Sequence, residues 1–181
     1  ISGAGSVGVT GSRTITLTGD NTYTGATTIT TGTLQIGNGA TTGSVAGNIV
    51  NNGTLAFNRS DAVTYAGTIS GSGNVVQTGA GTLTISGTAG YAGSTTINAG
   101  TLALSGAGSI AASSGVVNNG TFDISGTTSG ATINALTGTG AVALGSRTLT
   151  LANAAGTFSG AIGGTGGLTV ANGAQTLSGA N

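Results

Sequence analysis

The stretch from Gly81 to Leu104 reads GTLTISGTAGYAGSTTINAGTLAL, and it appears twice in the chain. Residues 14–36 match residues 82–104 without a gap, so every matched pair has the same offset. A third copy begins at Thr176 and stops at Asn181, before the position of the repeated tyrosine. Self-similarity at a fixed offset is typical of repeat architectures. The sequence therefore predicts a single domain over residues 1–181 that is a segment of a longer repeat protein.

Seven short runs alternate threonine or another small residue with an apolar residue. They begin at Thr14, Thr33, Thr54, Thr82, Thr101, Thr121 and Thr148. Alternation with period two puts two apolar side chains on one face of a strand and two small polar ones on the other. Glycine interrupts every stretch that could form a helix, and no apolar stripe has helical spacing. The runs therefore predict an all-β protein made of short strands.

The spacing of these runs indicates a solenoid. The runs recur along the whole chain, with Gly-, Asn- and Ser-rich turns between them. We therefore expect a parallel β-helix of about seven to eight coils, one per run and each of roughly 19–28 residues. Each strand would lie about 4.8 Å from its equivalent one coil along. In such a fold Leu17, Ile36 and Phe57 point into a common narrow interior.

Two recurring motifs predict the corners between strands. A Gly-x-Gly pair between two apolar residues recurs in residues 1–7, 69–75, 136–142 and 162–168. An Asn-Asn-Gly corner occurs at residues 51–53 and again at 118–120. Glycine permits positive φ and asparagine tolerates it, so both motifs suit tight corners. Stacked asparagines can also form hydrogen bonds along the rod.

The composition excludes several classes of protein. Glycine accounts for 38 of 181 residues, there is no proline or cysteine, and 3% of the residues are charged. Disordered chains are rich in charge and proline, and collagen needs glycine at every third position. The three arginines balance the three aspartates, so the net charge is zero. The sequence therefore has no cluster of basic residues that could bind nucleic acid or an anionic membrane. Without cysteine there is no disulfide framework.

The residues that carry most enzyme chemistry are missing from the sequence. It contains no histidine or cysteine, and its only acids are Asp20, Asp61 and Asp123. Zinc needs nitrogen or sulfur ligands, and paired-carboxylate catalysis needs two acids within several ångströms. Stacking in a solenoid could align two of the acids, but a solvated or turn role is favoured for each. We therefore predict no catalytic, metal-binding or cofactor-binding residues and no enzyme activity.

Three further patterns carry little weight. Residues 3–8 satisfy G-x-G-x-x-G, but no helix pattern follows, so a nucleotide site is not expected. The N-x-S/T pattern of glycosylation sequons begins at Asn52, Asn58 and Asn119, but nothing beyond the pattern supports glycosylation there. Tyr23 and Tyr91 could form an adhesive pair on one face, but the favoured interpretation is that each packs over a corner and sets the register of its coil.

The repeated segments resemble a known family, the passenger-associated transport repeat, also called the autotransporter-associated β-strand repeat. That family's pattern is similar to G-x-L-x-L-x-G-x-N-x-Y-x-G-x-T-x-I-x-x-G-x-L. Residues 14–36 match it most fully, and in residues 82–104 Ala89 replaces the asparagine. The resemblance implies a right-handed β-helix within the passenger domain of a bacterial autotransporter. It implies no catalytic residues.

The resemblance also implies a location and a function. Such passengers are displayed on the surface of Gram-negative bacteria, attached through a C-terminal outer-membrane β-barrel that lies outside this sequence. We therefore expect an extracellular rod segment that supports passenger secretion, folding and display. The alternative is an adhesin that binds host cells or other bacteria directly. Ice binding is a lesser alternative, because the outward pairs of the seven runs are irregular: Thr-Thr, Thr-Gln, Thr-Ala, Thr-Thr, Thr-Ala, Thr-Asp and Thr-Thr.

Overall fold

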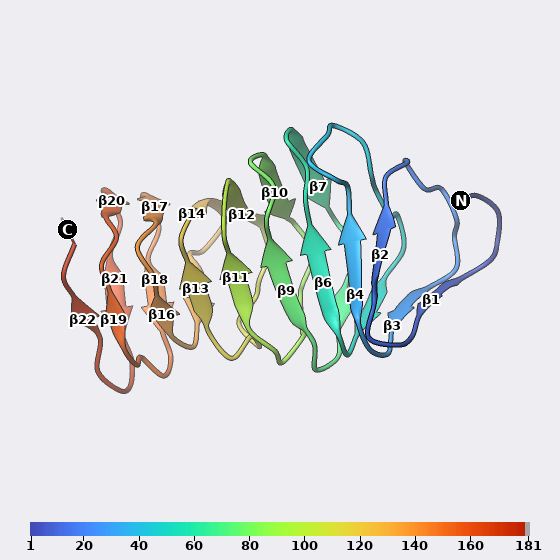
Figure 1. Cartoon of the computed structure of the whole chain (residues 1–181). Helices are drawn as coiled ribbons and strands as arrows, with labels where there is room; N and C mark the ends of the chain where they lie inside the picture. Colours follow the sequence, from blue (N-terminus) through green and yellow to red (C-terminus); the bar gives the residue numbers. More distant parts are fainter. Residues whose placement is uncertain (180–181) are drawn as a thin grey trace.

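The chain winds into a parallel β-solenoid, as predicted from the sequence (Figure 1), and the solenoid has about nine turns. The computed structural model describes residues 1–179, and all the regular structure in that range is β. Figure 1 shows the coils stacked side by side from the N-terminal to the C-terminal end of the rod. Every strand pair is parallel, and each coil contributes one short strand to each of up to three faces.

We name the faces by the order in which the chain visits them. The first face is a four-stranded sheet at the N-terminal end and a three-stranded sheet at the C-terminal end. Its strands are β1 (Val7–Val9), β3 (Thr27–Ile29), β5 (Ile49–Asn51) and β8 (Ile69–Ser70), then β15 (Ala131–Ile133), β18 (Leu149–Leu151) and β21 (Leu168–Val170). Only isolated bridges, Ile69 with Ala89 and Thr88 with Ser109, mark this face in the intervening coils.

The second face is the most regular. Its seven-stranded sheet comprises β2 (Thr14–Leu17), β4 (Thr33–Ile36), β6 (Thr54–Phe57), β9 (Asn74–Gln77), β11 (Thr95–Ile97), β13 (Val116–Asn118) and β16 (Leu136–Thr137). A bridge from Gly138 to Phe158 continues the stack to β19 (Thr157–Phe158), which pairs with β22 (Thr176–Leu177). This face therefore has nine rungs.

The third face begins later along the rod. Its six-stranded sheet comprises β7 (Ala62–Tyr65), β10 (Thr82–Ile85), β12 (Thr101–Gly106), β14 (Thr121–Thr127), β17 (Ala141–Gly145) and β20 (Ile162–Gly164). In the first two coils this side of the rod is irregular, and Asp20 and Ser44 form a single bridge there. The first strand of the third face thus lies next to loops at its N-terminal side.

The observed length of a coil differs from the length predicted from the spacing of the Thr-rich runs. On the second face, Thr14 pairs with Thr33, Thr33 with Thr54, and Thr54 with Asn74. A coil therefore holds about 20 residues, at the short end of the range for structural repeats. The longest predicted interval, from Thr54 to Thr82, is wrong for a coil, because that step covers one coil plus one further face. The predicted seven to eight coils are therefore too few.

The interior is narrow and apolar. Leu17, Ile36 and Phe57 occupy successive rungs of one inward row, and Ile36 and Phe57 are almost completely buried. The same row continues through Gln77, Ile97 and Asn118 on the following rungs. The common interior predicted for the apolar members of the runs is confirmed. Burial of such side chains is the main source of stability in a fold of this kind.

Glycine forms the Gly-x-Gly corners as expected. The first glycine of the motif has positive φ in all four copies, 96° at Gly3, 104° at Gly71, 110° at Gly138 and 128° at Gly164. The corner at Gly71 joins the first face to the second, the one at Gly138 joins the second to the third, and the one at Gly164 joins the third to the first. One corner motif therefore serves all three edges of the rod.

The two copies of the long repeat lie on different faces. Residues 14–17, 27–29 and 33–36 occupy the second, first and second faces, whereas residues 82–85, 95–97 and 101–104 occupy the third, second and third. Each strand of the second copy has moved one face onward. The offset between the copies, from Thr14 to Thr82, thus corresponds to three coils and one additional face.

Candidate functional site

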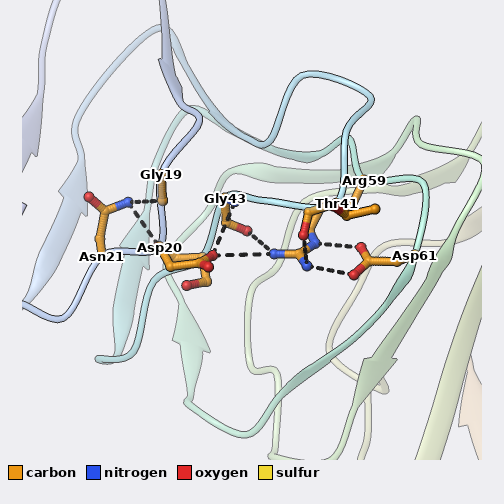
Figure 2. Close-up of polar contacts among 8 residues, drawn as sticks. Gly19, Asp20, Asn21, Thr41, Gly43, Arg59 and Asp61 are labelled. Atoms are coloured by element: carbon orange, nitrogen blue, oxygen red, sulfur yellow. Dashed lines mark hydrogen bonds and ion pairs between the residues drawn. The ribbon is translucent and has the colours of Figure 1, made fainter.

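Half of the six charged side chains meet in one cluster, which is the most polar arrangement in the described part of the rod (Figure 2). The Arg59 guanidinium donates from Nε to Asp61 Oδ1 and from Nη2 to Asp61 Oδ2, both at 2.8 Å. Its Nη1 lies 3.6 Å from Asp20 Oδ1. The side chain of Arg59 is 10% exposed, so the pair with Asp61 is a bidentate contact with one nearly buried partner.

The cluster also binds the backbone of the preceding coil. Arg59 Nη1 donates to the Gly43 carbonyl at 2.7 Å, and Nη2 donates to the Thr41 carbonyl at 2.5 Å. The Gly43 amide in turn donates to Asp20 Oδ1 at 3.2 Å. We call residues 37–48 the N-terminal strap, since they run beside β7, the first strand of the third face. The arginine fastens this strap to the rod.

The charges of the cluster stabilise one another. The hydrogen bond from Arg59 lowers the pKa of Asp61 below its ordinary value, and the bond to Asp61 raises the pKa of Arg59. Because the folded pKa of Asp61 is depressed, the contribution of the pair is fully present above the unfolded value of 3.8 and is lost as the pH falls through the folded value. The pair of Arg59 and Asp61 therefore stays ionised at neutral pH.

The sequence analysis did not predict this cluster, although the true coil length of about 20 residues would have indicated it. Asp20, Thr41 and Asp61 follow one another at about one coil length, which predicts that they lie on the same side of the rod; in the structure the bridge partner of Asp20 is Ser44, close to Thr41 in the chain. The predicted solvated role holds for Asp20, whose side chain is 63% exposed, and Asp61 is 37% exposed while it also pairs with Arg59. Asp123 does have a turn role, since its Oδ1 accepts a hydrogen bond from the Ser125 amide at 2.8 Å.

The two repeated tyrosines lie in the core. Tyr23 and Tyr91 are both 0% exposed, and their hydroxyls contact the Oγ1 atoms of Thr27 and Thr95 at 2.5 and 2.6 Å. Burial raises the pKa of Tyr91 to about 12. The packing interpretation is confirmed, and the adhesive pair is wrong, because neither ring reaches the surface.

The weaker sequence patterns also have ordinary structural roles. Gly3, within the G-x-G-x-x-G match, forms a corner at φ 96°. The last two residues of the match already belong to strand β1, whereas a phosphate-binding loop would lead into a helix. Asn52 and Asn119, which begin two of the sequons, are exposed at equivalent corners. Neither pattern brings together groups that act on a ligand.

The rest of the described rod offers no other cluster of chemically active groups. No group of three or more potential metal-ligating residues occurs within residues 1–179. In that same range we find no helix with the length and hydropathy to cross a membrane. A surface depression of about 220 Å³ lies where the first face is interrupted, and its lining is glycine, alanine, serine and threonine. The charged cluster is therefore the principal polar site of the described residues, and its contacts hold the N-terminal strap against the neighbouring coil.

Comparison with known proteins finds that the two repeats are similar to a family of repeats. The model of the passenger-associated transport repeat matches residues 9–36 and 75–104. Searches of curated proteins and of solved structures found no match. The matched regions contain the two copies recognised from the sequence, residues 14–36 and 82–104. Two regions of this β-solenoid thus match the repeat model, which is consistent with a repeat segment of an autotransporter passenger.

Proposed function

We propose that this chain is a structural rod segment of an autotransporter passenger, which supports secretion and folding of the passenger and its display at the bacterial surface. The observation that carries the proposal is a ladder of nine rungs on the second face, built from the coils that contain both repeats. An outer-membrane β-barrel elsewhere in the protein would anchor the rod. Its location would be the outside of a Gram-negative cell.

The ladder suits folding that proceeds coil by coil. Each strand pairs only with its equivalents one coil before and one coil after, as β4 does with β2 and β6. In such an array a new coil can add to the last one formed, without contacts from distant parts of the chain. A segment that emerges progressively from a membrane could therefore fold as it emerges, and the free energy of folding would oppose its return.

Direct adhesion is the less supported alternative. Aromatic side chains and arginine dominate the binding energy of most protein interfaces. Five of the six aromatic residues here are no more than 2% exposed, and the sixth, Tyr65, is 4% exposed. The outer faces therefore present mainly threonine, serine, asparagine and glycine. Host-cell or cell–cell contacts by this segment remain a prediction of the alternative.

Ice binding loses support for a different reason. The threonine runs do not share one plane, since those beginning at Thr14, Thr33 and Thr54 lie on the second face and those beginning at Thr82, Thr101 and Thr121 on the third. Neither face keeps a Thr-x-Thr pair on all its rungs: the second face has Asn74 and Val76 in the equivalent positions, and the third has Ala141 and Ala143. Thermal hysteresis by the purified segment would revive this alternative.

Deletion of one repeat from the parent passenger tests the proposal. Removing residues 14–81 joins Arg13 to Thr82, where the following sequence repeats what was lost, so the local sequence after the junction is kept although three coils and one further face are removed. We expect less passenger at the cell surface, measured by antibody labelling of intact cells and normalised to the anchored barrel. Unchanged display would contradict a role in secretion.

A second deletion distinguishes the effect of losing a repeat from the effect of shortening the rod. Removing residues 122–161 joins Thr121 to Ile162 and takes out two coils that the family model does not match, because Phe122, Val142 and Ile162 are successive rungs of one row. If the repeats promote transport, this deletion should reduce display less than removal of residues 15–54, which joins Thr14 to Leu55 and takes out two coils with most of the first repeat, because Ile15, Leu34 and Leu55 are successive rungs of one row. Equal losses would indicate that rod length alone matters.

A further inference from the structure

The two Asn-Asn-Gly corners have the same local sequence but different surroundings. Residues 50–54 and 117–121 both read Val-Asn-Asn-Gly-Thr. In each, the first asparagine is completely buried and the second, Asn52 or Asn119, is exposed. The intrinsic chemistry of the two Asn-Gly pairs is therefore matched, and any difference in their reactivity arises from the fold.

The Asn52 side chain is held in place by the next coil. Its Oδ1 accepts a hydrogen bond from the Ser72 amide at 3.1 Å and another from the Ser72 hydroxyl at 3.3 Å. Ser72 stands at the equivalent corner one coil further along. Two hydrogen bonds to one oxygen fix the orientation of the carboxamide and oppose its rotation toward its own backbone.

The Asn119 side chain lacks this support. One coil further along stands Thr139, and within residues 1–179 the Asn119 carboxamide makes no hydrogen bond. The Gly120 amide likewise has no acceptor in that range, whereas the neighbouring Asn119 amide donates to the Ile97 carbonyl at 2.8 Å. Both reacting groups of this Asn-Gly pair are therefore unrestrained.

The remaining Asn-Gly pairs are restrained at one group or the other. The Gly39 amide, after Asn38, donates to the Asn58 carbonyl at 2.8 Å. The Asn172 side chain donates from Nδ2 to Asn153 Oδ1 at 3.4 Å, within a ladder of stacked asparagines. Asn119 is thus the one Asn-Gly asparagine of the described chain with neither group held.

We propose that Asn119 is a site of spontaneous deamidation in the folded rod. The deprotonated Gly120 nitrogen attacks Cγ of Asn119, a new C–N bond forms, and the carboxamide nitrogen leaves as ammonia to give a five-membered succinimide. Water then opens the ring to aspartate or isoaspartate, so that the amide and one water become an acid and ammonia with no change of oxidation state. Glycine favours the attack because it has no side chain to hinder it, and asparagine is known as a thermolabile residue.

The product would change the corner where it forms. It adds a negative charge to a chain that has three acids. Isoaspartate also lengthens the backbone by one methylene, at a place where a Cβ on Gly120 would lie 2.6 Å from the Gly100 carbonyl oxygen. A chain displaced toward Gly100 would collide with that carbonyl, so the modification should loosen the connection between β13 and β14.

The experiment compares the two matched corners in one sample. The folded wild-type segment is incubated at mildly alkaline pH and physiological temperature, and peptide mapping by mass spectrometry follows the acid formed at each Asn-Gly pair. Asn119 should deamidate about tenfold faster than Asn52, the factor expected from two hydrogen bonds that hold the Asn52 oxygen. A parallel sample in concentrated urea should show nearly equal rates at the two sites.

Two results would overturn the proposal. One is a folded-state rate at Asn52 equal to or above that at Asn119. The other is no acid at Asn119 in the folded sample while the sample in urea reacts at both sites, which would mean that the corner is too rigid for attack. An Asn119→Ser variant serves as control, because it must abolish the signal at that peptide and leave that of Asn52 unchanged.

Discussion

Residues 14–36 and 82–104 have nearly the same sequence, yet the first copy folds on the first and second faces and the second copy on the second and third. Their internal pairings are equivalent all the same. Thr14–Leu17 pairs with Thr33–Ile36 just as Thr82–Ile85 pairs with Thr101–Leu104. The repeat therefore specifies strands one coil apart and the corners between them, and it does not specify a particular face of the rod.

The surroundings of the two copies differ more than their sequences. The first copy lies at the end of the described rod, where Ile15 is 45% exposed, whereas its counterpart Leu83 is 0% exposed. The first copy is also held by the Arg59 cluster, and the second has Thr88 where the first has Asp20. The same motif should thus tolerate change differently in its two positions.

The largest difference is expected in the core. Leu83→Ala should lower the free energy of unfolding by about 2–5 kcal/mol, since it opens a cavity between coils. Ile15→Ala removes a half-exposed side chain and should cost about 1 kcal/mol or less. Urea unfolding of the two variants measures both values. Equal losses would contradict the unequal burial of the two copies.

The glycines of the repeat give the next largest effect. Gly100 has φ 59°, and a Cβ there would lie 2.3 Å from the Gly81 carbonyl oxygen. Gly100→Ala should therefore cost about 2–4 kcal/mol, from backbone strain of about 1–2 kcal/mol and from the collision. Gly106 has the same φ and no atom within 4 Å, so Gly106→Ala is the control and should show the strain alone. Urea unfolding again gives both losses, and equal values would mean that the collision is relieved at no cost.

The buried hydroxyl of Tyr91 should make the stability of the rod depend on pH in the alkaline range. Removing the hydroxyl in Tyr91→Phe should cost about 1 kcal/mol at neutral pH through lost hydrogen bonding. The pKa of Tyr91 rises from 10.0 to about 12 on folding, so its contribution is complete below pH 10 and is lost as the pH rises toward 12. Melting temperatures measured across this alkaline range should therefore fall less steeply in the variant than in the wild type.

The smallest effect on global stability is expected at the charged cluster. Arg59→Ala leaves the coils intact but releases the N-terminal strap, whose contacts with Arg59 involve Thr41 and Gly43. Limited proteolysis by a non-specific protease should cut residues 37–48 faster in the variant, while residues 105–115 serve as an internal control. A uniform increase in cutting along the chain would mean that the arginine stabilises the whole rod.

Much of the fold could be predicted from the sequence, because period-two alternation and corner glycines are local signals. The coil length could not, since β7 and β9 begin with Ala62 and Asn74 and lack the Thr-Leu pattern of the other runs. Because these two strands are not among the seven runs, the interval from Thr54 to Thr82 was interpreted as a single coil. The Arg59 cluster was missed for the same reason, because only the shorter coil places Asp20, residues 41–44 and Asp61 on one side of the rod.

The pairing of Thr54 most directly tests the length of the coil. The structure pairs Thr54 with Asn74 and pairs Thr82 with Ala62. Neighbouring strands lie about 4.8 Å apart, within the reach of a disulfide, so the double variant Thr54→Cys with Asn74→Cys should cross-link on mild oxidation. The double variant Thr54→Cys with Thr82→Cys should remain reduced as a monomer. Efficient cross-linking of the second pair and none of the first would contradict the account.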